Sequence, residues 1–97
     1  MVMASLFRSL QLGALILPHR IVMAPLTRCR ADDGHIPNDL MAQYYVQRAS
    51  AGLIITEATM VMEGHSAFWR EPGIYSQQQI AGWRKITDAV HAADGRI

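Results

Sequence analysis

The sequence predicts an α/β fold: the N-terminal part of a (β/α)8 barrel, with an N-terminal β-hairpin and about two and a half βα units. Two observations favour it. Apolar runs alternate with amphipathic segments in the order hairpin, strand, helix, strand, helix, strand, which indicates parallel strands joined by right-handed crossovers. The junction after the first strand contains no glycine, whereas a doubly wound nucleotide-binding sheet normally carries glycine-rich phosphate chemistry there.

The hairpin is expected over residues 10–17. Leu10–Leu12 and Leu15–Leu17 are two short apolar runs, and Gly13 between them can supply a tight turn. Pro18 ends the second run.

Two βα units are expected over residues 21–95. The run Ile21–Ala24 is typical of a strand buried on both faces, as in a parallel sheet. A polar loop over 27–37 follows, and Asn38 can cap the first turn of a helix. A second buried strand is expected at Leu53–Thr56.

This first helix should end near Ala51, with Gly52 as its left-handed terminator. Side chains at helical spacing form a stripe along it. The stripe comprises Leu40, Tyr44 and Gln47, with Met41, Tyr45 and Arg48 alongside.

The second unit begins its connection with an irregular loop over 60–75, and loops of that length are often functional. Ser76 and Gln79 form a capping-box pair that opens a second helix, which Gly95 should stop. The apolar face of this helix comprises Ile80, Trp83, Ile86, Val90 and Ala93. Arg96–Ile97 is expected to begin a third strand.

The number of units leads to an expectation of truncation. A barrel of eight strands cannot close with two and a half units, and its chemistry lies on the loops after the strands. We therefore expect residues 1–97 to be an N-terminal fragment of one larger domain.

Composition limits the function classes. Nine Lys and Arg oppose eight Asp and Glu, and the basic residues are scattered, so no nucleic-acid surface is expected. No apolar run is long enough to cross a membrane, and no signal pattern opens the chain. The single cysteine, Cys29, excludes an internal disulfide, and we expect a cytoplasmic protein.

Three stretches carry a family resemblance. They read LFRSLQLGALILPHRIVMAPLTRCRA, LMAQYYVQRASAGLIITEAT and PGIYSQQQIAGWRKITDAVHAADGRI. They closely resemble the start of Old Yellow Enzyme family proteins, most of all the bacterial branch that reduces N-ethylmaleimide, nitrate esters and activated alkenes. The match runs collinearly from about Leu6 to Ile97, and MAPLTR followed by SAGLIITEAT is its most specific part.

The resemblance implies an FMN-dependent oxidoreductase, an ene-reductase built on a TIM barrel. In such a flavoprotein NADH or NADPH delivers a hydride to non-covalently bound FMN. The reduced flavin passes it to an alkene conjugated to a carbonyl or nitro group. The expected partners are therefore NAD(P)H and a small electrophilic alkene or nitro compound.

The resemblance also implies where this chain would touch the flavin. It assigns cofactor binding to Ala24, Pro25, Leu26 and Thr27 under the ring, with Thr27 near flavin O4, and to Ala58 beside the pyrimidine edge. Uncharged donors at that edge would stabilise the charge of the reduced flavin. Two alternatives stay open: the Thr27 hydroxyl is satisfied by its own backbone, and Ala58 is an ordinary small residue at a strand end.

Phe68 is the one substrate-binding residue that the resemblance implies. It falls where the family often has a tyrosine that walls the substrate cavity, and so it lacks the hydroxyl donor. The alternative is that Phe68 and Trp69 anchor the loop on the barrel rim. The segment MEGHSAFWRE departs most from the family pattern, so substrate preference stays open.

The remaining polar residues are weaker candidates. Cys29 lies two residues beyond the position of a flavin-tuning cysteine in another branch, and we interpret it as an inert thiol. The four histidines have no metal-ligand spacing, and His19 is interpreted as a turn residue. Glu57 is expected to pair with an arginine such as Arg28, because an unpaired buried carboxylate is costly. The resemblance places the family's catalytic residues beyond Ile97, so no catalytic residue and no metal ligand is assigned.

Two hypotheses of different classes follow. In the first, the chain is an inactive fragment of an FMN ene-reductase. In the second, it is a non-enzymatic truncated product, or a complementation fragment that works only after assembly. Exposed strand edges would favour self-association in either case.

Overall fold

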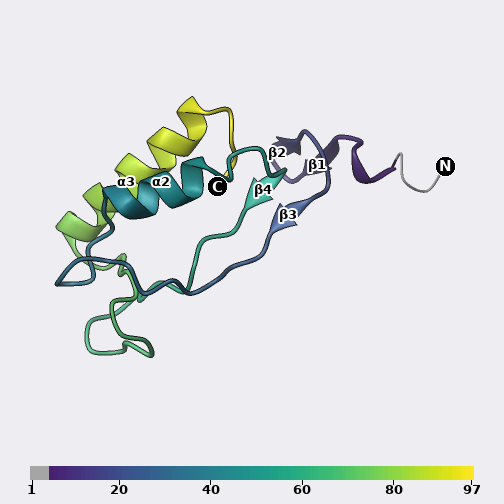
Figure 1. Ribbon diagram of the computed structural model, residues 1–97. Helices are drawn as coiled ribbons and strands as arrows, with labels where there is room; N and C mark the ends of the chain where they lie inside the picture. Colours follow the sequence, from purple (N-terminus) through teal and green to yellow (C-terminus); the bar gives the residue numbers. More distant parts are fainter. Residues whose placement is uncertain (1–4) are drawn as a thin grey trace.

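The computed structural model describes residues 5–97, in which two helices lie on one side of a pair of parallel strands and a hairpin lies at the amino-terminal end of that pair (Figure 1). The elements, in chain order, are β1 (Leu10–Leu12), β2 (Leu15–Leu17), β3 (Val22–Met23), α2 (Asp39–Val46), β4 (Leu53–Ile54) and α3 (Gln77–Ala92).

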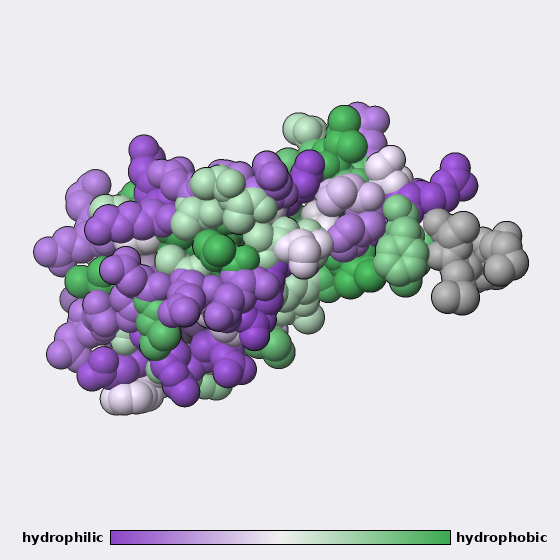
Figure 2. Space-filling model, turned by 45° about the horizontal axis from the view of Figure 1, so that its top comes forward, coloured by the Kyte–Doolittle hydropathy of each residue, from purple (hydrophilic) through white to green (hydrophobic). Residues whose placement is uncertain are grey.

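Strands β1 and β2 form the expected hairpin. They pair antiparallel with Leu10 opposite Leu17 and Leu12 opposite Leu15, and Gly13 turns the chain at a φ of 59°. Leu17 is buried, but most of the other apolar hairpin side chains are exposed. Figure 2 accordingly shows hydrophobic residues gathering toward the hairpin end, while the helical end is mainly hydrophilic.

Strands β3 and β4 run parallel, as expected, with Val22 opposite Leu53 and Met23 opposite Ile54. Both are shorter than the predicted runs; Pro25, which has no N–H, cannot extend the ladder of β3. The prediction that both strands are buried on both faces is wrong: Ile54 is buried, but Val22 is exposed. The reason is that the helices cover only one side of the pair (Figure 1).

The end of β4 also contacts the last residues of the chain. The Ile54 N–H donates to the Arg96 carbonyl at 2.8 Å. Arg96–Ile97 is not itself assigned to a strand, so a third strand beginning there stays a prediction.

Helix α2 begins where it was expected to begin. The Asn38 side chain accepts the Met41 N–H at 3.0 Å, and Asp39 places a negative charge in the first turn. Part of the expected stripe is buried: Met41 and Tyr45 are in the core, whereas Leu40 is exposed.

The end of α2 differs from the prediction. The helix ends at Val46, and tighter turns with bonds of the i to i+3 type continue the chain to Ala51. Gly52 is not a left-handed terminator, because its φ is not positive. A Cβ atom on Gly52 would lie 2.2 Å from the His19 carbonyl oxygen, so glycine is needed there for close approach of two backbone segments.

Helix α3 has the expected capping box, with Ser76 and Gln79 bonding to each other's backbone N–H groups. Its terminator is Asp94 at a φ of 63° and not Gly95. The Asp94 N–H donates to His91 and the Gly95 N–H to Val90, which is a Schellman motif. Gly95 has a packing role instead, because a Cβ there would lie 2.9 Å from the Ala49 Cβ.

The core lies between α2, α3 and β4. It comprises Ala31, Met41, Tyr45, Ala49, Ile54, Trp83, Ile86 and Val90. Of the apolar face predicted for the second helix, Trp83, Ile86 and Val90 are buried, whereas Ile80 and the C-cap residue Ala93 are exposed. The polar residue Gln79, by contrast, is fully buried. Its side-chain amide donates to the Gly34 carbonyl in the loop before α2, at 2.9 Å. None of the helices in the described part of the chain is long and apolar enough to cross a membrane.

The Asn38 cap gives a first testable prediction. Asn38→Ala removes the acceptor of the Met41 N–H and the donors to Arg30 and Asp32, so we expect a loss of about 1 kcal/mol in the free energy of unfolding. Asn38→Ser, which keeps a capping oxygen, should lose less. Urea denaturation followed by circular dichroism measures both, and equal stability of Asn38→Ala and the parent chain would contradict the cap.

Candidate functional site

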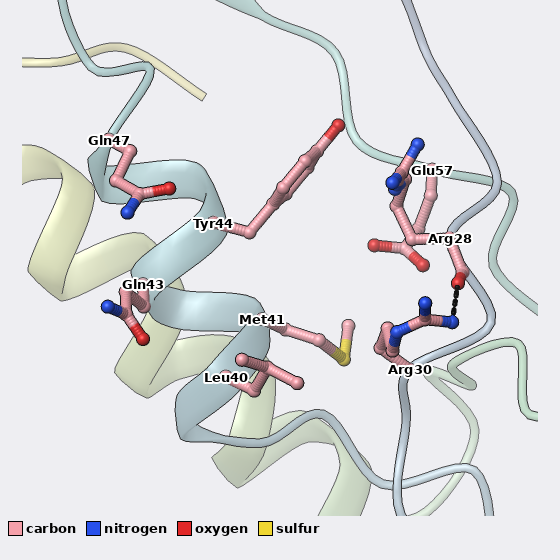
Figure 3. A pocket seen from close by; sticks show the side chains of 8 residues that line it. All are labelled: Arg28, Arg30, Leu40, Met41, Gln43, Tyr44, Gln47 and Glu57. Atoms are coloured by element: carbon pink, nitrogen blue, oxygen red, sulfur yellow. Dashed lines mark hydrogen bonds between the residues drawn. The ribbon is translucent and has the colours of Figure 1, made fainter.

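The segments that follow β3 and β4 run side by side toward the same end of the molecule (Figure 1). The pairing extends one residue past β4, since the Ile55 N–H donates to the Met23 carbonyl at 3.2 Å. Arg28 and Glu57, which adjoin Thr27 and Ala58, lie close together in Figure 3. The chain therefore brings the two predicted groups of cofactor residues to the carboxyl ends of neighbouring parallel strands.

The surface of these segments is accessible and uncharged at the predicted positions. Ala24, Pro25, Leu26 and Ala58 are exposed, and Thr27 is half-buried. Small or rigid side chains at a strand end allow a flat ring to approach the backbone. The assignment of these residues to the cofactor stays a prediction.

The Thr27 hydroxyl makes no hydrogen bond with any residue in the described range 5–97. Two of the other three threonines donate locally: Thr59 to the Glu57 carbonyl at 2.9 Å and Thr87 to the Arg84 carbonyl at 3.1 Å. The alternative in which Thr27 bonds to its own backbone is therefore not seen. Its hydroxyl remains available to a partner outside these residues.

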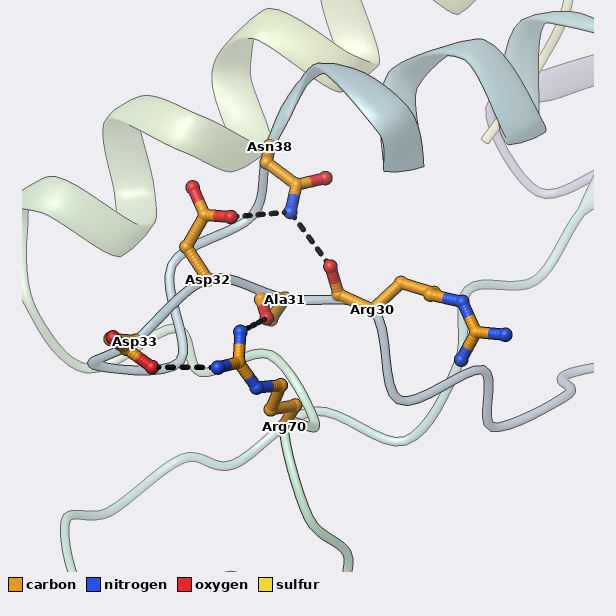
Figure 4. A network of polar contacts seen from close by, with 6 residues as sticks. All are labelled: Arg30, Ala31, Asp32, Asp33, Asn38 and Arg70. Atoms are coloured by element: carbon orange, nitrogen blue, oxygen red, sulfur yellow. Dashed lines mark hydrogen bonds and ion pairs between the residues drawn. The ribbon is translucent and has the colours of Figure 1, made fainter.

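The long loop after β4 is tied to the loop after β3, as Figure 4 shows. The Ala31 N–H donates to the Arg70 carbonyl at 3.1 Å, and the Arg70 guanidinium pairs with Asp33 at 3.0 Å. The His35 ring nitrogen Nδ1 lies 2.6 Å from the Glu71 carbonyl oxygen. These contacts make one rim out of two loops that are about 40 residues apart in sequence.

Phe68 and Trp69 lie on this rim with both rings exposed, at 48% and 74% of their surface. Trp69 stacks on the Arg70 guanidinium, 4.6 Å from the ring centroid. Burial of the two rings therefore does not anchor the loop. The anchoring contact comes from Glu71, which is 3% exposed and whose Oε1 accepts the Ala67 N–H at 2.7 Å.

Glu71 was not singled out by sequence reasoning. Its Oε1 also lies 3.4 Å from the Phe68 N–H, so one buried carboxylate holds the main chain on which the Phe68 ring is displayed. A lone glutamate in an irregular loop gives no pattern from which this role can be predicted.

Glu57 does not pair with Arg28 as predicted; its partner is Tyr45. The Tyr45 hydroxyl donates to Glu57 Oε2 at 2.7 Å and accepts the Glu57 N–H at 3.0 Å. The amide and guanidinium of Arg28 favour the charged carboxylate electrostatically, although the described contacts include no hydrogen bond or ion pair between the two side chains.

Burial and mutual hydrogen bonding shift the pKa values of both Tyr45 and Glu57. Burial raises the pKa of Glu57, and the Tyr45 hydroxyl and Arg28 only partly offset that rise. Burial and the bond to Glu57 raise the pKa of Tyr45, so it stays a protonated donor. Glu57 Oε1 has no hydrogen-bond partner among the described residues. Glu57 helps to line a cavity of about 330 Å³, together with Arg28, Tyr44 and other residues of α2 (Figure 3).

The remaining candidates give no metal centre. The described residues contain no group of three or more His, Cys, Asp or Glu side chains able to hold an ion. His19 has the expected turn role: its Nδ1 accepts the Ile21 N–H and its Nε2 lies 2.7 Å from the Ser50 carbonyl oxygen. Cys29 is a half-buried free thiol at a φ of 56°.

The chain is similar in sequence to a family of known proteins. A family model described as NADH:flavin oxidoreductase / NADH oxidase family matches residues 5–97. A probable flavin mononucleotide-dependent alkene reductase of Leishmania infantum is 52% identical over 92 residues, which are 95% of this chain and 25% of that protein.

Solved structures agree over the same span. The old yellow enzyme from Trypanosoma cruzi superposes with a TM-score of 0.93 at 56% identity, over 98% of this chain and 26% of that one. Morphinone reductase in complex with tetrahydroNAD gives a TM-score of 0.92 at 52% identity, over 96% and 25%. The chain thus spans about a quarter of the length of the proteins that it matches.

Proposed function

Because the chain belongs to the NADH:flavin oxidoreductase / NADH oxidase family, we propose that it supplies the first part of the FMN site of an NAD(P)H-dependent ene-reductase. Membership confirms the resemblance to Old Yellow Enzyme proteins. The structural neighbours also confirm the fold class as the N-terminal part of a (β/α)8 barrel. FMN and NAD(P)H are the cofactors of this family.

The proposal assigns the flavin to the carboxyl ends of β3 and β4. Ala24, Pro25 and Leu26 would lie against the ring, and Ala58 would lie at its pyrimidine edge. Bound FMN supplies the redox chemistry, carrying a hydride from NAD(P)H to an electron-poor alkene carbon. This chain's own contribution is to bind and orient the ring.

The free hydroxyl of Thr27 is the observation that carries the proposal. It lies directly after the first parallel strand and has no partner in the described part of the chain. A neutral donor fixed there would stabilise negative charge on the flavin without adding charge to the site. Ligand sites at the carboxyl ends of barrel strands are the general rule for this fold.

The rim supports the substrate class. Phe68 would offer an apolar wall to a small activated alkene or nitro compound, held in place by Glu71. A phenylalanine supplies no hydroxyl, so this wall would orient substrates by shape alone. The described site is neutral at Ala24–Thr27 and Ala58, which suits uncharged electrophiles.

We also propose that the chain needs the remaining three quarters of the barrel to hold FMN, and that it works in the cytoplasm. Residues that lie on one side of the flavin offer few of the contacts that a tight site requires. Apolar strand residues such as Val22 and Ile55 are exposed at 43% and 45%, which supports assembly with a complementary chain or with another copy. A non-enzymatic product is the competing hypothesis.

Flavin retention tests the proposal. Residues 1–97 are joined to the matching remainder of morphinone reductase, and absorbance is recorded after desalting with FMN. We expect a yellow fusion and a colourless 97-residue chain. A folded but colourless fusion would exclude the flavin site, and a yellow 97-residue chain would exclude the need for the remainder.

Substitution of Thr27 tests the assigned donor. In the fusion, Thr27→Val keeps the shape but removes the hydroxyl, so we expect the Kd for FMN to rise about two- to tenfold. The flavin reduction potential should fall as well, because the reduced form loses a donor. Thr27→Ser is the matched control and should stay near the parent; equal values for Val and Ser would contradict the assignment.

A further inference from the structure

A single hydroxyl holds both the main chain and the side chain of Glu57. Tyr45 lies on α2 with 1% of its surface exposed, and Glu57 is 3% exposed. The Tyr45 hydroxyl accepts the Glu57 N–H at 3.0 Å and donates its own O–H to Glu57 Oε2 at 2.7 Å. Both bonds are shielded from water, which makes their loss costly.

This contact lies where the sheet no longer fixes the backbone. Strand β4 ends at Ile54, and the last ladder-like bond is made by Ile55. At Glu57 the N–H is held by Tyr45 and the carbonyl by the Thr59 hydroxyl at 2.9 Å. Side chains therefore replace the ladder in setting the path of the chain around Ala58.

The Tyr45–Glu57 pair also lies near the segment that follows β3. The Glu57 carboxylate points from the β4 segment toward the region between α2 and Arg28 (Figure 3). Arg28 favours the charged form of this carboxylate across the gap. The Tyr45–Glu57 pair therefore interacts electrostatically with Arg28, the residue that follows Thr27.

We infer that Tyr45 is a positioning residue: its hydroxyl fixes the main chain at Glu57 and so sets where Ala58 meets the flavin. The inference rests on the proposed function, which assigns Ala58 to the flavin edge. Tyr45 itself acts through Glu57 and need not touch the cofactor. The neighbouring Tyr44 makes ring contacts with Arg28 and Arg48 but no bond to Glu57, which makes it a matched control.

Amide hydrogen exchange in the 97-residue chain tests the local step. Tyr45→Phe keeps the buried ring, so we expect the Glu57 amide to exchange about tenfold faster relative to the Gly95 amide, which is bonded to Val90 at the end of α3. Tyr44→Phe should leave that ratio unchanged. If the Glu57 and Gly95 amides accelerate equally in Tyr45→Phe, the role is general stability, and the inference is overturned.

FMN affinity tests the functional step in the fusion with the morphinone reductase remainder. We expect Tyr45→Phe to raise the Kd for FMN about five- to fiftyfold, because a buried carboxylate and N–H lose their partner. Tyr44→Phe should bind like the parent fusion. A parent fusion that holds no FMN rejects the proposed function itself. A parent that holds FMN, with equal affinity in the two Phe variants, overturns only the role of Tyr45.

Discussion

Replacing Gly52 with alanine is expected to cost at least about 3 kcal/mol of the free energy of unfolding. The new Cβ would lie 2.2 Å from the His19 carbonyl oxygen and 3.0 Å from that of Ile21, and neither is a flexible side-chain end. The Gly52 N–H donates to the Ile21 carbonyl at 2.8 Å. The methyl group would push apart the segments that begin the parallel pair. That loss is a large fraction of the stability of a domain of this size.

The control for this effect is Gly64→Ala. Gly64 has a φ of 82°, but a Cβ there meets nothing within 4 Å, so the change should cost only the strain of a left-handed alanine, about 1 kcal/mol. Urea denaturation of both variants, followed by tryptophan fluorescence, measures the difference. If Gly52→Ala cost no more than Gly64→Ala, the close approach of the two segments would be wrong.

Gly52 also shows why parts of the fold were predictable and others were not. A glycine after an amphipathic run has two common uses, as a helix terminator or as a point of close approach, and the local sequence is the same for both. The choice depends on His19, more than 30 residues away. The capping signals at Asn38 and Ser76, by contrast, are complete within four residues, and both were predicted correctly.

Burial on the helices follows the same logic. Helical spacing predicted that one face of α3 is buried, but it could not show that Gln79 is buried while Ile80 is exposed. Gln79 is satisfied by the Tyr75 and Ser76 N–H groups nearby and by Gly34, which lies 45 residues away. Once those bonds exist, burying a polar side chain is not costly.

The candidate site divides in the same way. Parallel pairing predicted that the segments after β3 and β4 leave the strands at one end, and Arg28 and Glu57, the neighbours of Thr27 and Ala58, lie close together there (Figure 3). The residues that hold these segments were missed, because Tyr45 and Glu71 act through bonds that no local pattern encodes. Glu57 was recognised as needing a partner, but the partner is a tyrosine and not an arginine.

The largest effect on the core is expected from Ile86→Ala. Ile86 has no exposed surface and lies in the cluster with Tyr45 and Trp83 between the two helices. Removing three carbons there takes away buried apolar surface and leaves a cavity that rigid aromatic neighbours cannot refill. We expect a loss of about 2–5 kcal/mol in the free energy of unfolding.

Ile80→Ala is the matched control on the same helix, and it separates periodicity from burial. Both isoleucines belong to the apolar stripe that the sequence predicts, yet Ile80 is 38% exposed and absent from the core cluster. Its truncation should cost only about 1 kcal/mol, because more than a third of its surface stays in water and no enclosed cavity is left. The midpoints of urea denaturation of the two variants give the comparison, provided that the dependence of the unfolding free energy on urea concentration is unchanged. Equal losses would mean that the stripe packs as the periodicity alone predicts and that α3 is rotated from the position described, which would also move Gln79 away from Gly34.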